Sequence, residues 1–300
     1  MFSSTNFWMG FAGLLYLVAG VFMLRKEINA ARGWNKLILL GSVFFAASLA
    51  AFAPEHFYGG PEYIQSMAPS WMPVRSFWPY FVGCALLAAA TSLTLRKFVR
   101  LSSTLLGLMF FLFVCMIYLP SLLAHLKNRL AWIFALRDLS FAAGAWALAG
   151  LYSRGSSPRL SKWMILFARI VVAAAAIFFA IQHFLHPEFA PGVPSLKLTP
   201  AWVPLAPVWS YLTGTLLLIA GAALLINKKA RTAAASIGLL MAILTLLLYV
   251  PILVMASQPP QVLEGINYVA DTLLFAGAAL LVAGALPEDA SLVRGSRAAQ

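Results

Sequence analysis

The chain has 300 residues, of which 62% are hydrophobic and only 10% are charged. Ordinary soluble domains carry about 25% charged residues, whereas here the mean hydropathy is +0.87, which excludes a water-soluble globule and, for the same reason, a disordered or fibrous chain. The net charge of +12 would favour nucleic-acid binding in a soluble protein, but in a membrane protein it is typical of Lys and Arg gathered in cytoplasmic loops.

Nine apolar segments are long enough to cross a membrane. A bilayer core about 30 Å thick needs about 20 apolar residues per helical span. We therefore predict an all-α polytopic membrane protein with nine transmembrane helices, at residues 7–24, 37–54, 77–95, 101–123, 138–152, 163–183, 207–226, 233–255 and 267–286. The fifth segment is short for a span.

The positive charges predict an orientation. With the amino terminus outside, the inner segments hold fifteen Lys and Arg and the outer segments hold five, with Arg137 counted among the outer ones. This ratio predicts an outer amino terminus and a cytoplasmic carboxyl terminus. All four histidines and six of the nine acids then fall on the outer side, so we expect any chemistry there.

An internal duplication relates the two parts of the chain. A shift of 131 residues pairs Trp, Pro and Tyr residues in order, which helical low complexity does not easily produce. The pairs include Trp71 with Trp202, Trp78 with Trp209, Gly83 with Gly214, Tyr118 with Tyr249 and Pro120 with Pro251; a shift of 127 pairs His56-Phe57 with His183-Phe184, and one of 133 pairs Asp138 with Asp271.

Each repeat therefore contains four spans, and the first span is extra. Because four is even, both copies cross the membrane in the same direction, as parallel repeats about an axis along the membrane normal. We expect an extra helix with its loop at 1–35, a first four-helix repeat at 36–153, a second at 154–288 and a cytoplasmic tail at 289–300.

The residues of the second repeat carry a family resemblance. They are His183-Phe184, Pro187-Glu188-Phe189, Thr199-Pro200-Ala201-Trp202-Val203-Pro204, Gly214 and the basic turn Asn227-Lys228-Lys229-Ala230-Arg231. This pattern resembles the DoxX family of small four-helix membrane proteins, and the first repeat matches it more loosely. The resemblance covers about residues 36–286 and implies the helix bundle together with a subunit role in quinol-linked oxidoreductase complexes. Many members carry a glutamate three residues after the glycine, where this chain has Leu86 and Leu217.

Asp138 and Asp271 are the first candidate site residues, each at the outer start of the last predicted helix of its repeat. Such an acid can be purely structural, because the helix dipole stabilises a negative charge near a helix N-terminus by about 0.3–1 kcal/mol. Acids at membrane depth are also costly and often functional. Both readings stay open, and we take Asp138 and Asp271 as candidate catalytic or ligand-contacting residues.

Histidines and acids near the outer ends of the spans form a second group. His56 with Glu62, and His183 with His186 and Glu188, can relay protons or bind a metal. Because Pro187 follows His186 at once and the first repeat has a single histidine there, we favour hydrogen-bonded histidines over a metal site. We predict His56 and His183 as proton relays, Glu62 and Glu188 as ligand contacts, and no metal.

Aromatic residues form a third group. Belts of Trp and Tyr are expected at the water–lipid boundary, but these rings can also stack on a quinone or an isoprenoid. We expect the proline-flanked Trp71 and Trp202 to fold back over the helices, and we include Tyr118 and Tyr249 as ligand contacts.

Our hypothesis is a tandem-duplicated DoxX-like protein of a bacterial inner membrane. It would act as an accessory subunit of a quinone-linked redox system and bind a quinone or isoprenoid near the outer leaflet, with membrane lipid and redox subunits as partners and no nucleic acid. Two alternatives remain: an enzyme in which an intramembrane acid protonates an isoprenoid or sterol-like lipid, and a structural subunit without a ligand. The sequence contains no phosphate-binding loop, GxSxG, HExxH or CxxCH motif.

Overall fold

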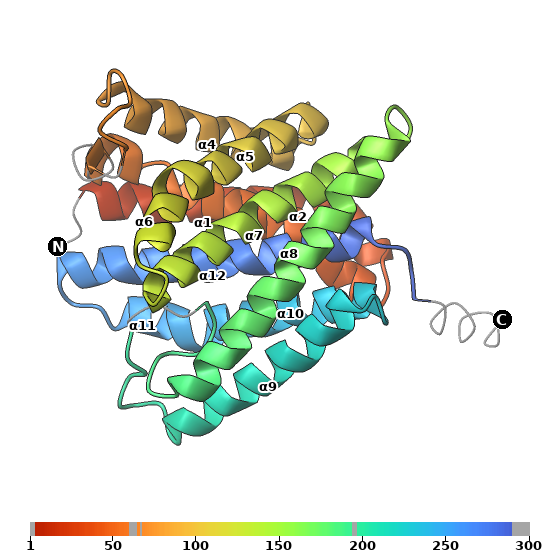
Figure 1. The fold of residues 1–300 in the computed structure, drawn as a ribbon. Helices are drawn as coiled ribbons and strands as arrows, with labels where there is room; N and C mark the ends of the chain where they lie inside the picture. Colours follow the sequence, from red (N-terminus) through yellow and green to blue (C-terminus); the bar gives the residue numbers. More distant parts are fainter. Residues whose placement is uncertain (1–3, 60–64, 67, 194–196, 290–300) are drawn as a thin grey trace.

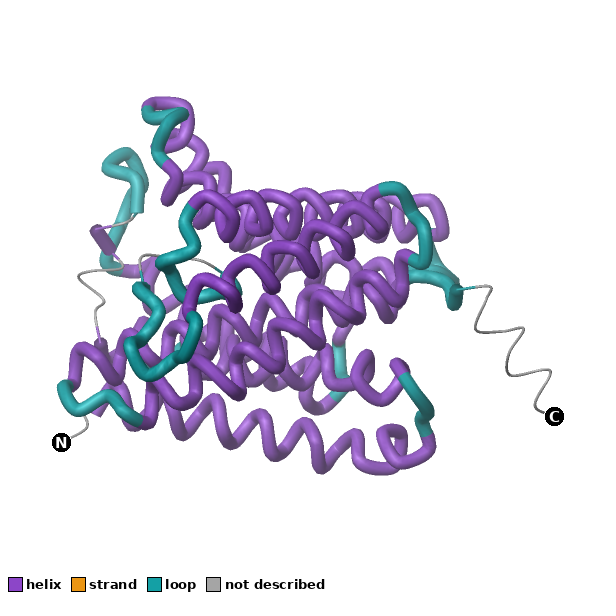
Figure 2. The backbone as a smooth tube through the Cα atoms, turned by 90° about the horizontal axis from the view of Figure 1, so that it is seen from below, coloured by secondary structure: helices purple, strands orange, loops and turns teal. Residues whose placement is uncertain are grey.

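The computed structural model describes residues 4–59, 65–66, 68–193 and 197–289. Within these residues, nine helices are long and apolar enough to cross a membrane, and no strand is formed beyond an isolated bridge between Phe189 and Leu198. The prediction of an all-α polytopic membrane protein is confirmed. Figures 1 and 2 show the long helices running side by side, with the two chain ends at opposite ends of the bundle.

The elements follow the predicted spans in order. They are α1 (Ser4–Ala30), α2 (Trp34–Phe52) with the π-helix η1 (Glu55–Gly59), α4 (Phe77–Leu95), α5 (Val99–Phe113) continued by η2 (Val114–Tyr118) and α6 (Leu119–Ala124), α7 (Arg129–Tyr152), α8 (Pro158–Leu185), α9 (Ala206–Leu225), α10 (Ala230–Leu244) continued by η3 (Thr245–Tyr249) and α11 (Val250–Val254), and α12 (Pro259–Ala285).

Most helices begin within five residues of the predicted position, but α7 and α12 begin eight or nine residues earlier. α7 starts at Arg129, where the Asn128 side chain caps it by accepting a 3.0 Å hydrogen bond from the Leu130 amide. α12 starts at Pro259, behind a capping box formed by Gln258 and Gln261. The expectation that Asp138 and Asp271 sit at helix starts is therefore wrong, because both lie well inside their helices.

The two repeats share one hydrophobic core. The first helix of each repeat packs along the last helix of the other, α2 on α12 and α8 on α7, while α7 and α12 also touch. Phe45, Phe141, Phe179 and Phe275 are all fully buried in this core. The helices of the two predicted repeats therefore form one interlocked bundle, and the repeat boundaries remain a prediction from the sequence.

Glycines allow the closest helix approaches. A Cβ added at Gly144 of α7 would lie 2.6 Å from Cα of Ala278 on α12, and one added at Gly277 would lie 2.8 Å from the Phe45 amide nitrogen on α2. Small residues at such contacts let helices in lipid pack backbone against backbone. These positions hold together the helices that carry the candidate site.

Three local features recur in both repeats. Gly83 packs against His56 and Phe57, as Gly214 packs against His183 and Phe184. The Trp78 indole donates to the Pro73 carbonyl over 2.9 Å, and the Trp209 indole donates to the Pro204 carbonyl over 3.0 Å. The π-helices η2 and η3 precede Pro120 and Pro251. These matches follow the register of the sequence duplication.

Candidate functional site

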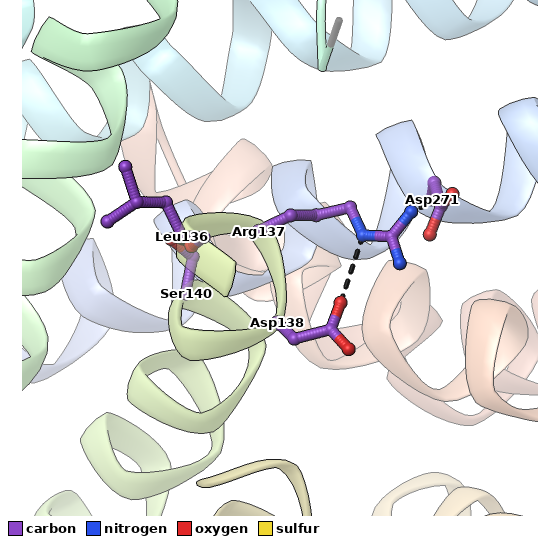
Figure 3. Close-up of polar contacts among 5 residues, drawn as sticks. All are labelled: Leu136, Arg137, Asp138, Ser140 and Asp271. Atoms are coloured by element: carbon purple, nitrogen blue, oxygen red, sulfur yellow. Dashed lines mark hydrogen bonds and ion pairs between the residues drawn. The ribbon is translucent and has the colours of Figure 1, made fainter. Parts of the chain in front are cut away.

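An ion triad joins the two repeats at the centre of the interlocked bundle. Arg137 Nε donates to Asp138 Oδ1 over 2.9 Å, and its Nη1 donates to Asp271 Oδ2 over 2.8 Å. Figure 3 shows the guanidinium extending from α7 toward the carboxylate on α12, with Asp138 beside it on α7. Ser140, drawn in the same view, donates to the Leu136 carbonyl over 2.7 Å and so takes no part in the triad.

The triad lies deep in the membrane-spanning region. Asp138 follows the start of α7 by nine residues and Asp271 follows the start of α12 by twelve, which is about 13 and 18 Å at 1.5 Å per residue. This depth is beyond the first helical turn, to which the helix-dipole effect is confined. Stabilisation by the helix dipole therefore does not explain why these two acids are present.

The triad is enclosed by protein but keeps some accessible surface. The Asp138 side chain is 7% exposed, whereas the Arg137 and Asp271 side chains each remain 18% exposed. Two carboxylates and one guanidinium leave one formal negative charge, and the bonds described use only two of the five guanidinium N–H groups. A polar ligand or a proton can therefore still interact with the triad.

Tyr118 and Tyr249 come from the paired π-helices η2 and η3 but have different partners. The Tyr118 hydroxyl donates to the Asp138 carboxylate. The Tyr249 hydroxyl donates to the Pro191 carbonyl over 3.0 Å and lies near Thr272. Each π-helix precedes a proline, which has no N–H to continue the helical ladder, and π-helices occur frequently at functional sites. The structure thus brings Tyr118 to the triad and uses Tyr249 to hold a loop.

A second polar contact lies next to the triad on the side of the bundle that holds the amino terminus. The Asn267 amide on α12 donates to the Glu55 carboxylate of η1. Asn267 is one helical turn before Asp271, so both side chains share a face of α12. The Asn267 Oδ1 atom is buried and accepts no hydrogen bond from the residues that the structure describes.

The two repeats do not contribute equally to this cluster. The position equivalent to Arg137 in the second repeat is Ala270, and the position equivalent to Glu55 is Gln182. The triad is therefore built from one arginine of the first repeat and one aspartate from each repeat. The paired acids thus occur in both repeats, whereas the cation between them occurs only in the first.

The predicted histidines lie near the same end of the bundle and make backbone contacts. His183 is buried, and its Nε2 lies 3.2 Å from both the amide nitrogen and the carbonyl oxygen of Gly192. His56 Nδ1 lies 3.0 Å from the Phe52 carbonyl oxygen. These contacts fix a loop and a helix end, so the structure gives the predicted relay histidines anchoring partners and does not bring them into the triad.

The remaining predicted ligand contacts lie in loops. Trp71 and Trp202 are 70% and 43% exposed, and Glu188 pairs with His186 over 3.3 Å. Glu62 lies outside the described residues. Among the residues that are described, no group of three or more His, Cys, Asp or Glu could hold a metal ion.

Sequence reasoning identified both aspartates and Tyr118 but missed Arg137, Glu55 and Asn267. The sequence predicts an outer loop at Arg137, because a charge ordinarily ends an apolar span. The signal that could have found it is the adjacent pair Arg137-Asp138, since neighbouring opposite charges can be neutralised inside a helix. Nothing local in the sequence pairs Glu55 with Asn267, which is 212 residues away.

The chain was also compared with known proteins. No family model matches it. Searches of the curated proteins and of the solved structures likewise return no match, so the likeness to the DoxX family rests on the residue pattern alone.

Proposed function

We propose that this protein binds a hydrophobic ligand with a polar head, a quinone or an isoprenoid, near the outer leaflet, as an accessory subunit of a quinone-linked redox system. The observation that carries the proposal is the Arg137–Asp138–Asp271 triad, which lies at membrane depth and yet is not fully covered. Charged groups inside a membrane protein are costly and usually mark a functional position.

The chemistry of the triad fits a quinone head group. A quinone carries carbonyl oxygens that accept hydrogen bonds, and the guanidinium has N–H donors beyond those bound to the aspartates. The reduced form carries hydroxyl groups, for which the carboxylates are acceptors. The apolar tail of the ligand would lie among the lipid-facing side chains, where its transfer from water is favourable.

The DoxX resemblance adds independent support for a quinone-linked role, since the implied family includes subunits of such complexes. An enzyme that protonates an isoprenoid would use the same acids, and a structural subunit would use the triad only as an ion pair between repeats. Ligand binding and turnover separate these alternatives.

Binding of a short-chain quinone to the protein in lipid nanodiscs tests the proposal. Arg137→Lys keeps the charge but removes the forked donor geometry, and we expect it to weaken quinone binding by about tenfold, the value of one strong hydrogen bond. Arg169→Lys is the matched control, because Arg169 also lies in a span but donates to the Leu224 and Leu225 carbonyls at the end of α9.

Each outcome is decisive. Wild-type binding no stronger than that of empty nanodiscs would contradict the proposal and leave the structural subunit. Equal losses in Arg137→Lys and Arg169→Lys would show that the triad does not contact the ligand. Chemical conversion of an isoprenoid by the wild type, abolished in Asp138→Asn, would replace the binder with the enzyme.

A further inference from the structure

We infer that Glu55 and Asn267 form a proton route from the aqueous surface at the amino-terminal end of the bundle to Asp271. This deepens the proposed function, because it rests on the triad as the ligand site and adds how that site exchanges protons. It is carried by a line of polar side chains that the proposed ligand contacts do not use.

The route begins at the end of α2. Glu55 is the first residue of η1, three residues after α2 ends at Phe52. Its carboxylate is half-buried and points inward, since it accepts a hydrogen bond from the Asn267 amide on α12. An acid in this position can exchange protons with water on one side and with the bundle interior on the other.

The route continues along one face of α12. Asn267 and Asp271 are four residues apart, which places them one above the other on the helix, about 6 Å apart along its axis. Side chains at this spacing are neighbours, but Asn267 Oδ1 makes no hydrogen bond to the described residues. We therefore place one bridging water between the two side chains, since such a water makes two to four hydrogen bonds.

A specific atom provides a place for that water. Asn267 Oδ1 is buried and accepts no hydrogen bond from the described residues, and a buried amide oxygen costs free energy unless a donor reaches it. A water that donates to Oδ1 can also donate to the Asp271 carboxylate. The proton then passes from the Glu55 carboxyl to this water while the water gives one proton to Asp271, so that one O–H bond breaks for each that forms.

The surroundings of Asp271 make it the receiving group. The charged and titratable groups around it come from four elements: Arg137 and Asp138 on α7, Tyr118 on η2, Tyr249 on η3 and Glu55 on η1. Among the described residues, Arg137 bonds to the Asp271 carboxylate through Oδ2. The other oxygen, Oδ1, is left to accept the incoming proton.

The second repeat supplies an internal comparison. Gln182 stands where the first repeat has Glu55, so the fold accepts an amide at this helix end. An amide cannot release and regain a proton as a carboxylic acid does. The second repeat therefore lacks the first group of the route, which confines the route to the first repeat.

A second acid on α12 is distinguished from the route by its bonds. Glu264 accepts from Tyr268 over 2.8 Å and from Lys197 over 3.1 Å. Both of its oxygens are thus already engaged, and Glu264 itself is exposed. It serves as the control acid on the same helix.

Infrared spectroscopy after a pH jump tests the route in ligand-free nanodiscs. The carboxylic acid band that is lost in Asp271→Asn reports protonation of Asp271. We expect Glu55→Gln to slow the appearance of this band at least about tenfold, as loss of a proton-transfer group typically costs a hundredfold or more. Glu55→Asp should retain most of the rate, and Glu264→Gln should leave it unchanged.

Three results would overturn the inference: an unchanged rate in Glu55→Gln, equally slow rates in Glu55→Gln and Glu264→Gln, or no Asp271-dependent band at any pH at which the protein stays folded. Because no quinone is present, these results are independent of ligand binding. If the protein binds quinone but Glu55→Gln leaves the protonation rate unchanged, the proposed function stands and the proton route is contradicted. If Glu55→Gln slows protonation but the protein binds no quinone, the proton route stands and the proposed function is contradicted.

Discussion

Arg137 and Asp271 belong to different repeats, and the 2.8 Å bond between Nη1 and Oδ2 makes their contact part of the interface on which the interlocked bundle depends. The same guanidinium also holds Asp138 on its own helix. One cation therefore serves two acids at the place where α7 and α12 meet, and stability and ligand chemistry depend on the same side chain.

Removal of that cation should destabilise the protein strongly. Arg137→Gln leaves two carboxylates enclosed without their partner, and breaking a buried ion pair from one side costs about 3–5 kcal/mol. The triple change Arg137→Gln, Asp138→Asn and Asp271→Asn should recover most of that loss, because no unpaired charge remains. Reversible unfolding in mixed micelles measures both. A triple variant no more stable than Arg137→Gln alone would show that charge is not the cause.

The contact between α7 and α12 should also be sensitive to added side-chain volume. Gly144→Ala places a methyl group 2.6 Å from the Ala278 Cα, and since the obstacle is backbone, the helices must separate. We expect a loss of about 1–3 kcal/mol in the free energy of unfolding, as for other overpacked cores. Gly10→Ala on α1 is the control, because nothing lies within 4 Å of the added methyl. Equal stability of the two variants would contradict this close contact.

Much of the fold could be predicted from the sequence, because a membrane span is indicated by apolar composition averaged over many residues. Nine spans, their order and their recurrence depend on windows of about 20 residues, and a few misplaced residues do not alter them. The helix starts depend on single side chains. The sequence predicts a loop at Arg137, whereas in the structure Arg137 is an ion-paired residue inside α7. The helix therefore begins at Arg129, before the predicted position.

The site was predictable only in part, because the sequence signal for it is the internal repeat. The duplication marked Asp138, Asp271, Tyr118 and Tyr249, because a repeat exposes equivalent positions. It could not mark Arg137 or Glu55, because the equivalent positions in the second repeat hold Ala270 and Gln182. The features that differ between the copies are the ones that a repeat search discards, and here they include the cation and the first acid of the inferred route.

The paired tyrosines should respond differently to loss of the hydroxyl. Tyr249→Phe removes the 3.0 Å bond to the Pro191 carbonyl, which should free the loop after α8 at a cost of about 1 kcal/mol. Hydrogen exchange of the amides in residues 187–193 should then speed up about fivefold. Tyr118→Phe should leave this exchange unchanged, because its hydroxyl bonds to Asp138 instead. Faster exchange in both variants would point to a general loosening of the bundle.

The predicted orientation can be tested with labels on the two faces of the bundle. The structure strengthens its basis, because Arg137 leaves the outer count and only four of the five outer cations remain in loops or at helix ends. In a chain whose Cys84 and Cys115 are replaced by serine, Ser70→Cys and Ser156→Cys each place a thiol at an exposed position on opposite faces without changing charge. We expect a membrane-impermeant maleimide to label the thiol at position 70 in intact cells, and the thiol at position 156 only after the membrane is opened. The reverse pattern would place the triad nearer the cytoplasmic leaflet, and the ligand and proton route would then have to open toward the cytoplasm.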